Sequence, residues 1–174
     1  MTDKIRAARL QDAEGIAHVH IESWRTTYKG IVPADFLAAL SYGRRVEEWK
    51  KRLSASSPCV FVYVAVDEQD QVIGFVNGGK PQQPDENEYS GELYAIYLLQ
   101  EYQGRGLGRV LMRQLVEGLA RAEMYSMFLW VLKDNPGCRF YESLGGQLIR
   151  EQLITIGGVA LEEVAYGWKD IRVM

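Results

Sequence analysis

A glycine-rich hexapeptide at residues 103–108 constrains the fold of this chain more than any other segment. It reads Gln-Gly-Arg-Gly-Leu-Gly and joins an aromatic and aliphatic run at residues 88–98 to a segment whose leucines recur every three or four residues. The first pattern predicts a strand and the second an amphipathic helix. A helix that begins among glycines brings several unpaired backbone N–H groups to one point, at the positive end of the helix dipole. We therefore expect this turn to bind a phosphate or a diphosphate.

On the residues alone, three interpretations of this turn stay open. A P-loop requires Gly-Lys-Ser/Thr after its glycines, whereas Gly108 is followed by Arg109 and Val110. A dinucleotide-binding fold requires the spacing Gly-x-Gly-x-x-Gly near the start of a βαβ unit. Here the spacing is Gly-x-Gly-x-Gly and lies late in the chain, although a strand and Asp134 follow the helix. The third interpretation is a glycine turn that binds no ligand.

Hydrophobic periodicity predicts a single α/β domain over residues 1–174. The expected order is one strand, two helices, three strands, one helix, one strand, one helix and two strands. Asp12 is placed as the N-cap of the first helix, Gly30 ends that helix, and Pro33 starts the next one. Strands are expected at residues 5–9, 59–66, 71–77, 88–98, 127–132, 147–156 and 159–168.

Charge and cysteine content narrow the classes of function. Lys and Arg number 20 against 23 Asp and Glu, a net charge of −3, so the basic footprint of a nucleic-acid-binding protein is missing. Cys59 and Cys138 lie far apart without metal-ligand spacing, and we expect reduced thiols, no metal site and a cytoplasmic protein. Residues 1–4 start no apolar signal-peptide region, and no apolar run is long enough to predict a membrane span.

The hexapeptide and the segment downstream of it resemble a known family. Gln103-x-x-Gly106-x-Gly108 is similar to the GNAT signature Gln/Arg-x-x-Gly-x-Gly/Ala, and the order of elements and the run from Asn135 to Tyr141 are similar too. The resemblance covers nearly the whole chain. It implies the GNAT fold, an α/β (α+β) domain whose mixed, mostly antiparallel sheet has about seven strands and four or five flanking helices. Strands 4 and 5 are expected to splay apart, and acetyl-CoA is the expected co-substrate.

The resemblance also implies roles for individual residues in acetyl transfer. Glu92, at the start of the strand before the glycine turn, is the expected general base, directly or through water; Glu88 and Glu101 are alternatives. Tyr141 is the expected general acid, which gives its hydroxyl proton to the departing thiolate. The backbone N–H of Leu98 is the expected donor to the thioester oxygen.

On the same resemblance, the splayed strand, the glycine turn and the short helix after the fifth strand bind the cofactor. Asn135 is expected to cap that helix through Pro136 and to contact the pantetheine, although it lies one residue closer to Tyr141 than in the commoner pattern. Cys138 replaces a small apolar residue, and the alternative for it is an acetyl-cysteine intermediate. The expected cofactor-binding residues are Ile96, Tyr97, Leu98, Gln103, Gly104, Arg105, Gly106, Leu107, Gly108, Arg109, Asn135, Cys138 and Phe140.

The acceptor pocket in this superfamily is built mainly from the first helices and the last hairpin. Trp24 and Tyr28 are the expected acceptor-binding residues, because aromatic groups suit an organic cation; core packing is the alternative. The expected reaction is direct transfer of acetyl to a primary amine of a small molecule or peptide. Its rivals are a non-catalytic acyl-CoA-binding module and a protein N-terminal or lysine acetyltransferase. The sequence does not reveal the oligomeric state; members of the family are often dimers, and the strand at residues 159–168 of the terminal hairpin offers apolar surface for a homodimer.

Overall fold

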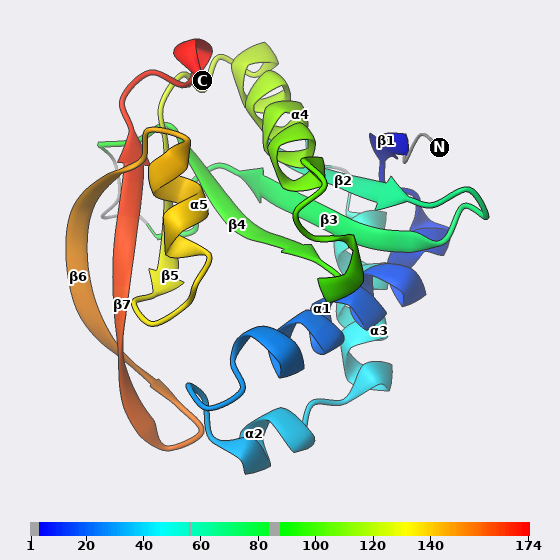
Figure 1. Cartoon of the computed structure of the whole chain (residues 1–174). Helices are drawn as coiled ribbons and strands as arrows, with labels where there is room; N and C mark the ends of the chain where they lie inside the picture. The colour runs from blue at the N-terminus through cyan, green and yellow to red at the C-terminus, as the bar shows by residue number, and fades with distance from the viewer. Residues whose placement is uncertain (1–3, 56, 84–87) are drawn as a thin grey trace.

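The computed structural model describes residues 4–55, 57–83 and 88–174; residues 1–3, on which part of the signal-peptide prediction rests, lie outside them. Within the described residues, seven strands form one sheet in the order β1-β2-β3-β4-β5-β7-β6 (Figure 1). Neighbouring strands are antiparallel except for β4 and β5, which are parallel. The mixed, mostly antiparallel sheet is therefore confirmed. Its strands are β1 Lys4–Ala7, β2 Val60–Val66, β3 Val72–Gly79, β4 Gly91–Leu98, β5 Met127–Leu132, β6 Gln147–Ile156 and β7 Val159–Trp168.

Five α-helices flank this sheet in the part of the chain that the structure describes, as expected. They are α1 Ala13–Thr27, α2 Ala34–Ala38, α3 Tyr42–Ser54, α4 Leu107–Arg121 and α5 Cys138–Ser143. The expected order was wrong in one respect, because three helices rather than two separate β1 from β2. The chain leaves the helical conformation between α2 and α3, where the Ser41 hydroxyl accepts a hydrogen bond from the Arg44 N–H at 3.3 Å and caps α3.

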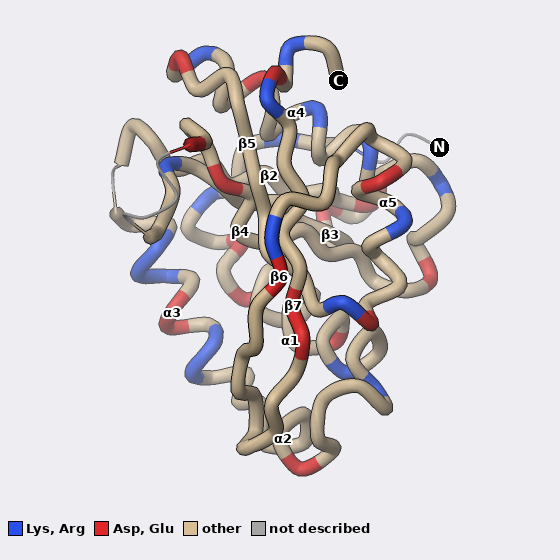
Figure 2. The backbone as a smooth tube through the Cα atoms, turned by 90° about the vertical axis from the view of Figure 1, so that its left-hand side faces the viewer, with Lys and Arg blue, Asp and Glu red and all other residues tan. Residues whose placement is uncertain are grey.

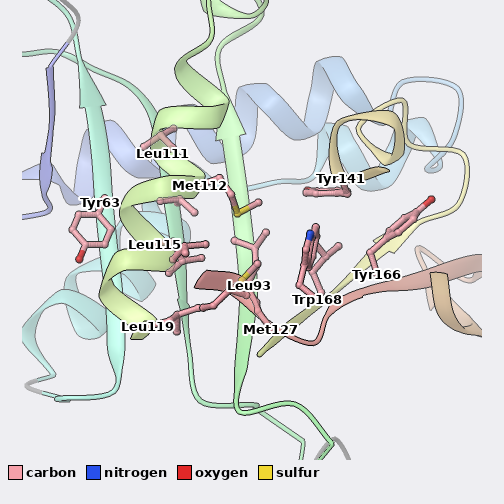
Figure 3. Close-up of a cluster of buried hydrophobic side chains, with 14 of the residues drawn as sticks. Tyr63, Leu93, Leu111, Met112, Leu115, Leu119, Met127, Tyr141, Tyr166 and Trp168 are labelled. Atoms are coloured by element: carbon pink, nitrogen blue, oxygen red, sulfur yellow. The ribbon is translucent and has the colours of Figure 1, made fainter. Parts of the chain in front are cut away.

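The helices cover the two faces of the sheet with separate apolar clusters. Leu111, Leu115 and Leu119 of α4 are fully buried against one face (Figure 3), which confirms the periodicity of the segment after the glycines. Burying each such side chain stabilises the fold by about 1.5–3 kcal/mol. Helices α1 and α3 pack on the opposite face through residues such as Ile16 and Trp49. The outer side of α3 alternates basic and acidic residues (Figure 2), which form exposed ion pairs.

The predicted splay of strands 4 and 5 is confirmed by the pairing of the sheet. β4 and β5 pair at two positions only, Gly91 with Met127 and Glu92 with Phe128. Beyond Glu92, the β4 residues Leu93 and 95–98 pair with β3 and none pairs with β5, so the edge of β4 that faces β5 is left open beyond this point. A bulge in the β3–β4 pairing accompanies the divergence, and bulges increase the local twist of a strand.

The last elements differ little from expectation. The short helix begins at Cys138 with Gly137 as its N-cap, so the expectation that Asn135 caps this helix through Pro136 was wrong. The Asn135 side chain instead stabilises the turn before the helix by accepting a hydrogen bond from the Gly137 N–H at 2.7 Å. The terminal hairpin has the predicted bounds, and its turn uses Gly157 and Gly158 with φ of 57° and 79°. Two left-handed residues match the twist of a tight hairpin. In the described residues we find no helix with the length and apolarity required to cross a membrane.

Candidate active site

The glycine turn provides a backbone cradle at the N-terminus of α4. Gly104 and Gly106 adopt φ of 73° and 84°, and Gly106 is the N-cap of the helix. This left-handed conformation is unfavourable for residues with a side chain. A Cβ atom at either glycine would meet nothing within 4 Å, so it is the backbone shape rather than crowding that requires glycine. The Gln103 side chain ties the turn to β4 by donating to the Leu98 carbonyl at 3.0 Å.

A cavity of about 640 Å³ extends from this turn into the splay between β4 and β5. It combines the open edge of β4, the N-terminus of α4, the inner side of β5 and the loop before α5. Most of the expected cofactor-binding residues line it together. These are Ile96, Tyr97, Leu98, Gln103, Gly104, Gly106, Gly108, Arg109, Asn135 and Phe140.

Three expected cofactor-binding residues do not line the cavity. Leu107 is buried in the apolar cluster beneath α4. Arg105 turns back along the chain, because its guanidinium donates to the Glu101 carbonyl at 2.8 Å and lies over the Tyr102 ring. The Cys138 thiol lies 3.6 Å from the Leu132 carbonyl oxygen, and burial raises the pKa of that thiol. A raised thiol pKa disfavours the thiolate that an acetyl-cysteine intermediate requires.

The backbone of β4 points a donor into the splay. The Leu99 N–H donates to the Ile73 carbonyl of β3 at 3.0 Å. Because successive residues of a strand direct their backbone groups to opposite sides, the Leu98 N–H faces away from β3 and towards the cavity. The Leu98 carbonyl accepts from Gln103 on the same side. The geometry therefore fits the donor position that the resemblance implies for Leu98.

The hydroxyl of Tyr141 lies on α5 beside the cavity, in a buried aromatic setting. The side chain is 8% exposed and its ring packs against Phe140 and Tyr166, with centroids 5.5 and 6.1 Å away. Burial raises the pKa of Tyr141 well above its ordinary value, with smaller contributions from Tyr28 and Cys138. No residue in the described ranges hydrogen-bonds to this hydroxyl. The Tyr141 hydroxyl is therefore protonated, and its proton is not used in a hydrogen bond to any described residue.

Two further hydroxyls, those of Tyr28 and Tyr97, lie close together in the lining of the cavity between β4 and β5. The Tyr28 hydroxyl accepts a hydrogen bond from the Asn135 side-chain amide at 3.1 Å and lies 3.4 Å from the Tyr97 hydroxyl. Burial is the main cause that raises the pKa of both tyrosines, so both stay neutral. Tyr28, expected on the acceptor side, thus lies in direct contact with Asn135, expected on the cofactor side.

The other expected acceptor residue, Trp24, packs beside this cluster rather than lining the cavity. Its ring lies 4.7 Å from that of Tyr28 and packs with the apolar residues of α2 and the terminal hairpin. His20, one turn earlier, accepts a hydrogen bond from the Trp49 indole at 3.3 Å. Burial, followed by the charges of Arg45 and Arg52, lowers the pKa of His20 to about 3. His20 is therefore neutral and structural at physiological pH.

Glu92 lies at the closed end of β4, where the strand still pairs with β5. It is 8% exposed, and its Oε2 accepts a hydrogen bond from the Gln82 backbone N–H at 2.7 Å. It does not itself line the cavity, but Leu93 and Tyr94, the residues that follow it, do. Of the alternative bases, Glu88 lies 3.7 Å from the Lys169 ammonium and Glu101 is exposed beside the glycine turn.

The structure also identifies cavity residues that the sequence patterns missed. Leu129, Trp130 and Val131 of β5 form the side of the cavity opposite β4, and Thr27 closes it beside Tyr28. The continuous apolar character of β5 predicts a strand buried on both faces, but it carries no sign that one edge of that strand faces a ligand cavity. The described residues contain no group of three or more His, Cys, Asp or Glu that could hold a metal.

Sequence comparison agrees with the fold and the cavity. The family model of the FR47-like proteins matches residues 82–154. An uncharacterized N-acetyltransferase, YuaI, of Bacillus subtilis is 41% identical over 170 residues, which span 98% of this chain and 95% of that protein. A mycothiol acetyltransferase of Renibacterium salmoninarum is 34% identical over 83 residues, or 47% of this chain and 25% of that protein.

Solved structures share the architecture at lower sequence identity. The PaiA N-acetyltransferase of Thermoplasma acidophilum, in complex with coenzyme A, is 22% identical with a TM-score of 0.70, over 94% of this chain and 98% of that one. A GNAT superfamily phosphinothricin acetyltransferase of Sinorhizobium meliloti, in complex with acetyl-CoA, is 20% identical with a TM-score of 0.72. The match covers 97% of this chain and 88% of that one. These two likenesses concern the fold.

The fold, the open β4 edge and the glycine cradle together define an acetyltransferase architecture. With the full-length relative at 41% identity, the chain belongs to the N-acetyltransferases of the GNAT superfamily.

Proposed function

We propose that this enzyme transfers the acetyl group of acetyl-CoA directly to a primary amine of a small molecule or a peptide. The observation that carries the proposal is the meeting of three features in one cavity: the left-handed glycine turn, the open edge of β4 and the protonated Tyr141 hydroxyl. Each supplies a different requirement of acyl transfer, namely anion binding, alignment of the donor and protonation of the leaving group.

The chain's own residues fit the donor. The N–H groups of the glycine turn would bind the diphosphate, with Arg109 beside them at the cavity edge. The open edge of β4 would hydrogen-bond to the pantetheine amides, as an added strand does. Acetyl-CoA, when bound, supplies a thioester-activated acetyl group.

Catalysis would then depend on three groups of the protein. Glu92, directly or through water, would take a proton from the acceptor amine, which otherwise carries a positive charge at neutral pH. The Leu98 N–H would donate to the thioester oxygen as negative charge develops there. Tyr141 would give its proton to the departing sulfur.

The test is a free-thiol assay with acetyl-CoA, a panel of small amines and a panel of peptides. We expect thiol release to depend on at least one primary amine, with double-reciprocal plots that intersect. Calorimetry with coenzyme A, run in parallel, distinguishes the two alternative functions. Binding of coenzyme A without turnover favours a non-catalytic acyl-CoA-binding module. Turnover with peptides but with no small amine favours a protein acetyltransferase. The absence of any affinity for coenzyme A or acetyl-CoA would overturn the proposal.

A further inference from the structure

The hydrogen bonds of the Tyr28 hydroxyl determine where its proton points. Tyr28 is 5% exposed and lines the cavity. Its oxygen accepts a hydrogen bond from the Asn135 side-chain amide at 3.1 Å, and its other close polar neighbour is the Tyr97 hydroxyl at 3.4 Å. A hydroxyl has two acceptor positions and one proton. The direction of the bond between the two tyrosines therefore decides which of them keeps a free proton.

This bond runs from Tyr97 to Tyr28. The indole N–H of Trp24 comes close enough to the Tyr97 hydroxyl to oppose the rise in the pKa of Tyr97 that burial causes, although it does not reach normal hydrogen-bond geometry. A hydroxyl polarised by a neighbouring donor is itself a stronger donor, so Tyr97 donates to Tyr28. Burial raises the pKa of both tyrosines, and the bond between them raises that of Tyr97 further and opposes the rise at Tyr28.

The Tyr28 proton is thus left without an acceptor among the described residues. Asn135 and Tyr97 fill both acceptor positions of the Tyr28 oxygen. Buried hydroxyls usually find a hydrogen-bond partner, and the remaining direction open to this one is the cavity that Tyr28 lines. The Tyr28 O–H is therefore a donor fixed in place at the cavity surface.

Helix α1 holds this donor beside the open edge of β4. The Ser23 hydroxyl of α1 donates to the Leu98 carbonyl at 3.4 Å. The N–H and C=O of a strand residue point to the same side, so the Leu98 N–H also lies on the side that α1 approaches. Tyr28 follows Ser23 by about 7.5 Å along the helix axis. Its charge, after the larger effect of burial, raises the pKa of Tyr141, so the two hydroxyls face the same part of the cavity.

We propose that the Tyr28 hydroxyl is a second donor to the thioester oxygen, beside the backbone N–H of Leu98. This inference rests on the proposed function and adds a catalytic residue to it. When the amine nitrogen bonds to the acetyl carbon, the carbonyl electron pair moves onto oxygen, where both donors stabilise the negative charge. The pair then returns, the C–S bond breaks, and sulfur takes the Tyr141 proton. The acylated nitrogen loses a proton to solvent, from which Tyr141 is reprotonated, while Tyr28 keeps its proton throughout.

Tyr28 suits this role better than that of binding the acceptor, which the family resemblance implied. With both acceptor positions filled, its oxygen has no position left to receive an amine N–H. The two bonds that it accepts strengthen its own O–H as a donor, and burial raises its pKa, so it stays protonated. Because Asn135 and Tyr97 already fix the hydroxyl, it needs no rearrangement as the oxyanion forms.

The test is infrared spectroscopy of bound acetyl-CoA that is isotopically labelled at the carbonyl carbon. A donor to the carbonyl oxygen weakens the C=O bond, so the stretch should lie at a lower frequency in the wild-type complex than in free acetyl-CoA. In Tyr28→Phe the stretch should move back towards the free value. The variant should lose about a hundredfold to a thousandfold in kcat, while the calorimetric dissociation constant of acetyl-CoA stays close to that of the wild type.

Two further tyrosine variants make the assignment specific. Tyr141→Phe should lower kcat but leave the carbonyl stretch in place, because its proton goes to sulfur. Tyr97→Phe should move the stretch in the same direction as Tyr28→Phe but by less, because Tyr28 keeps its O–H and loses one of the two bonds that polarise it. Tyr97→Phe also gives a reading should Tyr28→Phe not fold.

Failure of this inference differs from failure of the proposed function. An unchanged carbonyl stretch or an unchanged kcat in Tyr28→Phe would overturn the role of Tyr28, while the proposed function stands. If the wild-type enzyme acetylates none of the amines or peptides, the proposed function fails, and the role of Tyr28 in transfer fails with it.

Discussion

The side-chain amide of Asn135 donates a hydrogen bond to the Tyr28 hydroxyl at 3.1 Å, although the two residues lie 107 positions apart. This bond joins the C-terminus of α1 to the loop between β5 and α5, across the floor of the splay. The same Asn135 side chain accepts from the Gly137 N–H at 2.7 Å. One buried amide therefore fixes both the C-terminal end of α1 beside the cavity and the turn before the helix that carries Tyr141.

This double role predicts a cost in stability when the amide is removed. Asn135→Ala should lower the free energy of unfolding by about 1–3 kcal/mol, because the Tyr28 hydroxyl and the Gly137 N–H lose their partner. Tyr28→Phe removes one of the two bonds and should cost less. Urea unfolding of both single variants and of the double variant measures the coupling. Fully additive effects would show that the bond between Asn135 and Tyr28 contributes nothing.

Removal of the Tyr141 hydroxyl should affect catalysis far more than folding. Tyr141→Phe should reduce kcat by about tenfold to a thousandfold, while the free energy of unfolding changes by less than about 0.5 kcal/mol, because no described residue hydrogen-bonds to that hydroxyl. The matched control is Tyr125→Phe, at a 40% exposed tyrosine outside the cavity, which should leave kcat unchanged. A Tyr141→Phe enzyme with wild-type turnover would disprove its role as general acid.

The left-handed backbone of the glycine turn predicts a matched pair of glycine substitutions. Gly106→Ala should cost about 1–2 kcal/mol, because alanine is strained at a φ of 84°, and should weaken coenzyme A binding. Gly43→Ala, in the first turn of α3 with no atom within 4 Å of its added Cβ, should raise stability by about 0.4–1 kcal/mol. Melting temperatures and calorimetric dissociation constants for coenzyme A report the two effects. Unchanged coenzyme A affinity in Gly106→Ala would contradict a cradle at this turn.

The buried neutral His20 predicts a loss of stability in acid. Its pKa falls from the model-peptide value of 6.5 to about 3 in the folded protein, so between these values the unfolded chain binds one more proton than the folded one. Stability should therefore fall as pH drops from about 6.5 towards 3, by up to about 1.4 kcal/mol per pH unit. Urea unfolding of the wild type and of His20→Phe at several pH values in this window measures the difference. Identical slopes would show that His20 does not titrate as the structure implies.

Local patterns were sufficient for much of the fold and for part of the candidate site. The bounds of the terminal hairpin, the leucine face of α4 and the turn at Gly104 and Gly106 each depend on residues close together in the chain, and each was predicted. The count of N-terminal helices was wrong, because the break before α3 depends on the capping bond of Ser41, which a hydrophobic pattern does not reveal. The roles of Glu92 and Tyr141 came from family resemblance and remain predictions.

The amino-acid sequence by itself determined most of the elements and the glycine turn before α4, because periodicity and glycine conformation act within a few residues. Only the tertiary structure decided which residues share the cavity. The contact between Tyr28 and Asn135 and the distance of Glu92 from the cavity lining both follow from strand order and register. Strand order and register depend on which residues far apart in the sequence pack together in the folded protein, and no local sequence pattern encodes these long-range contacts.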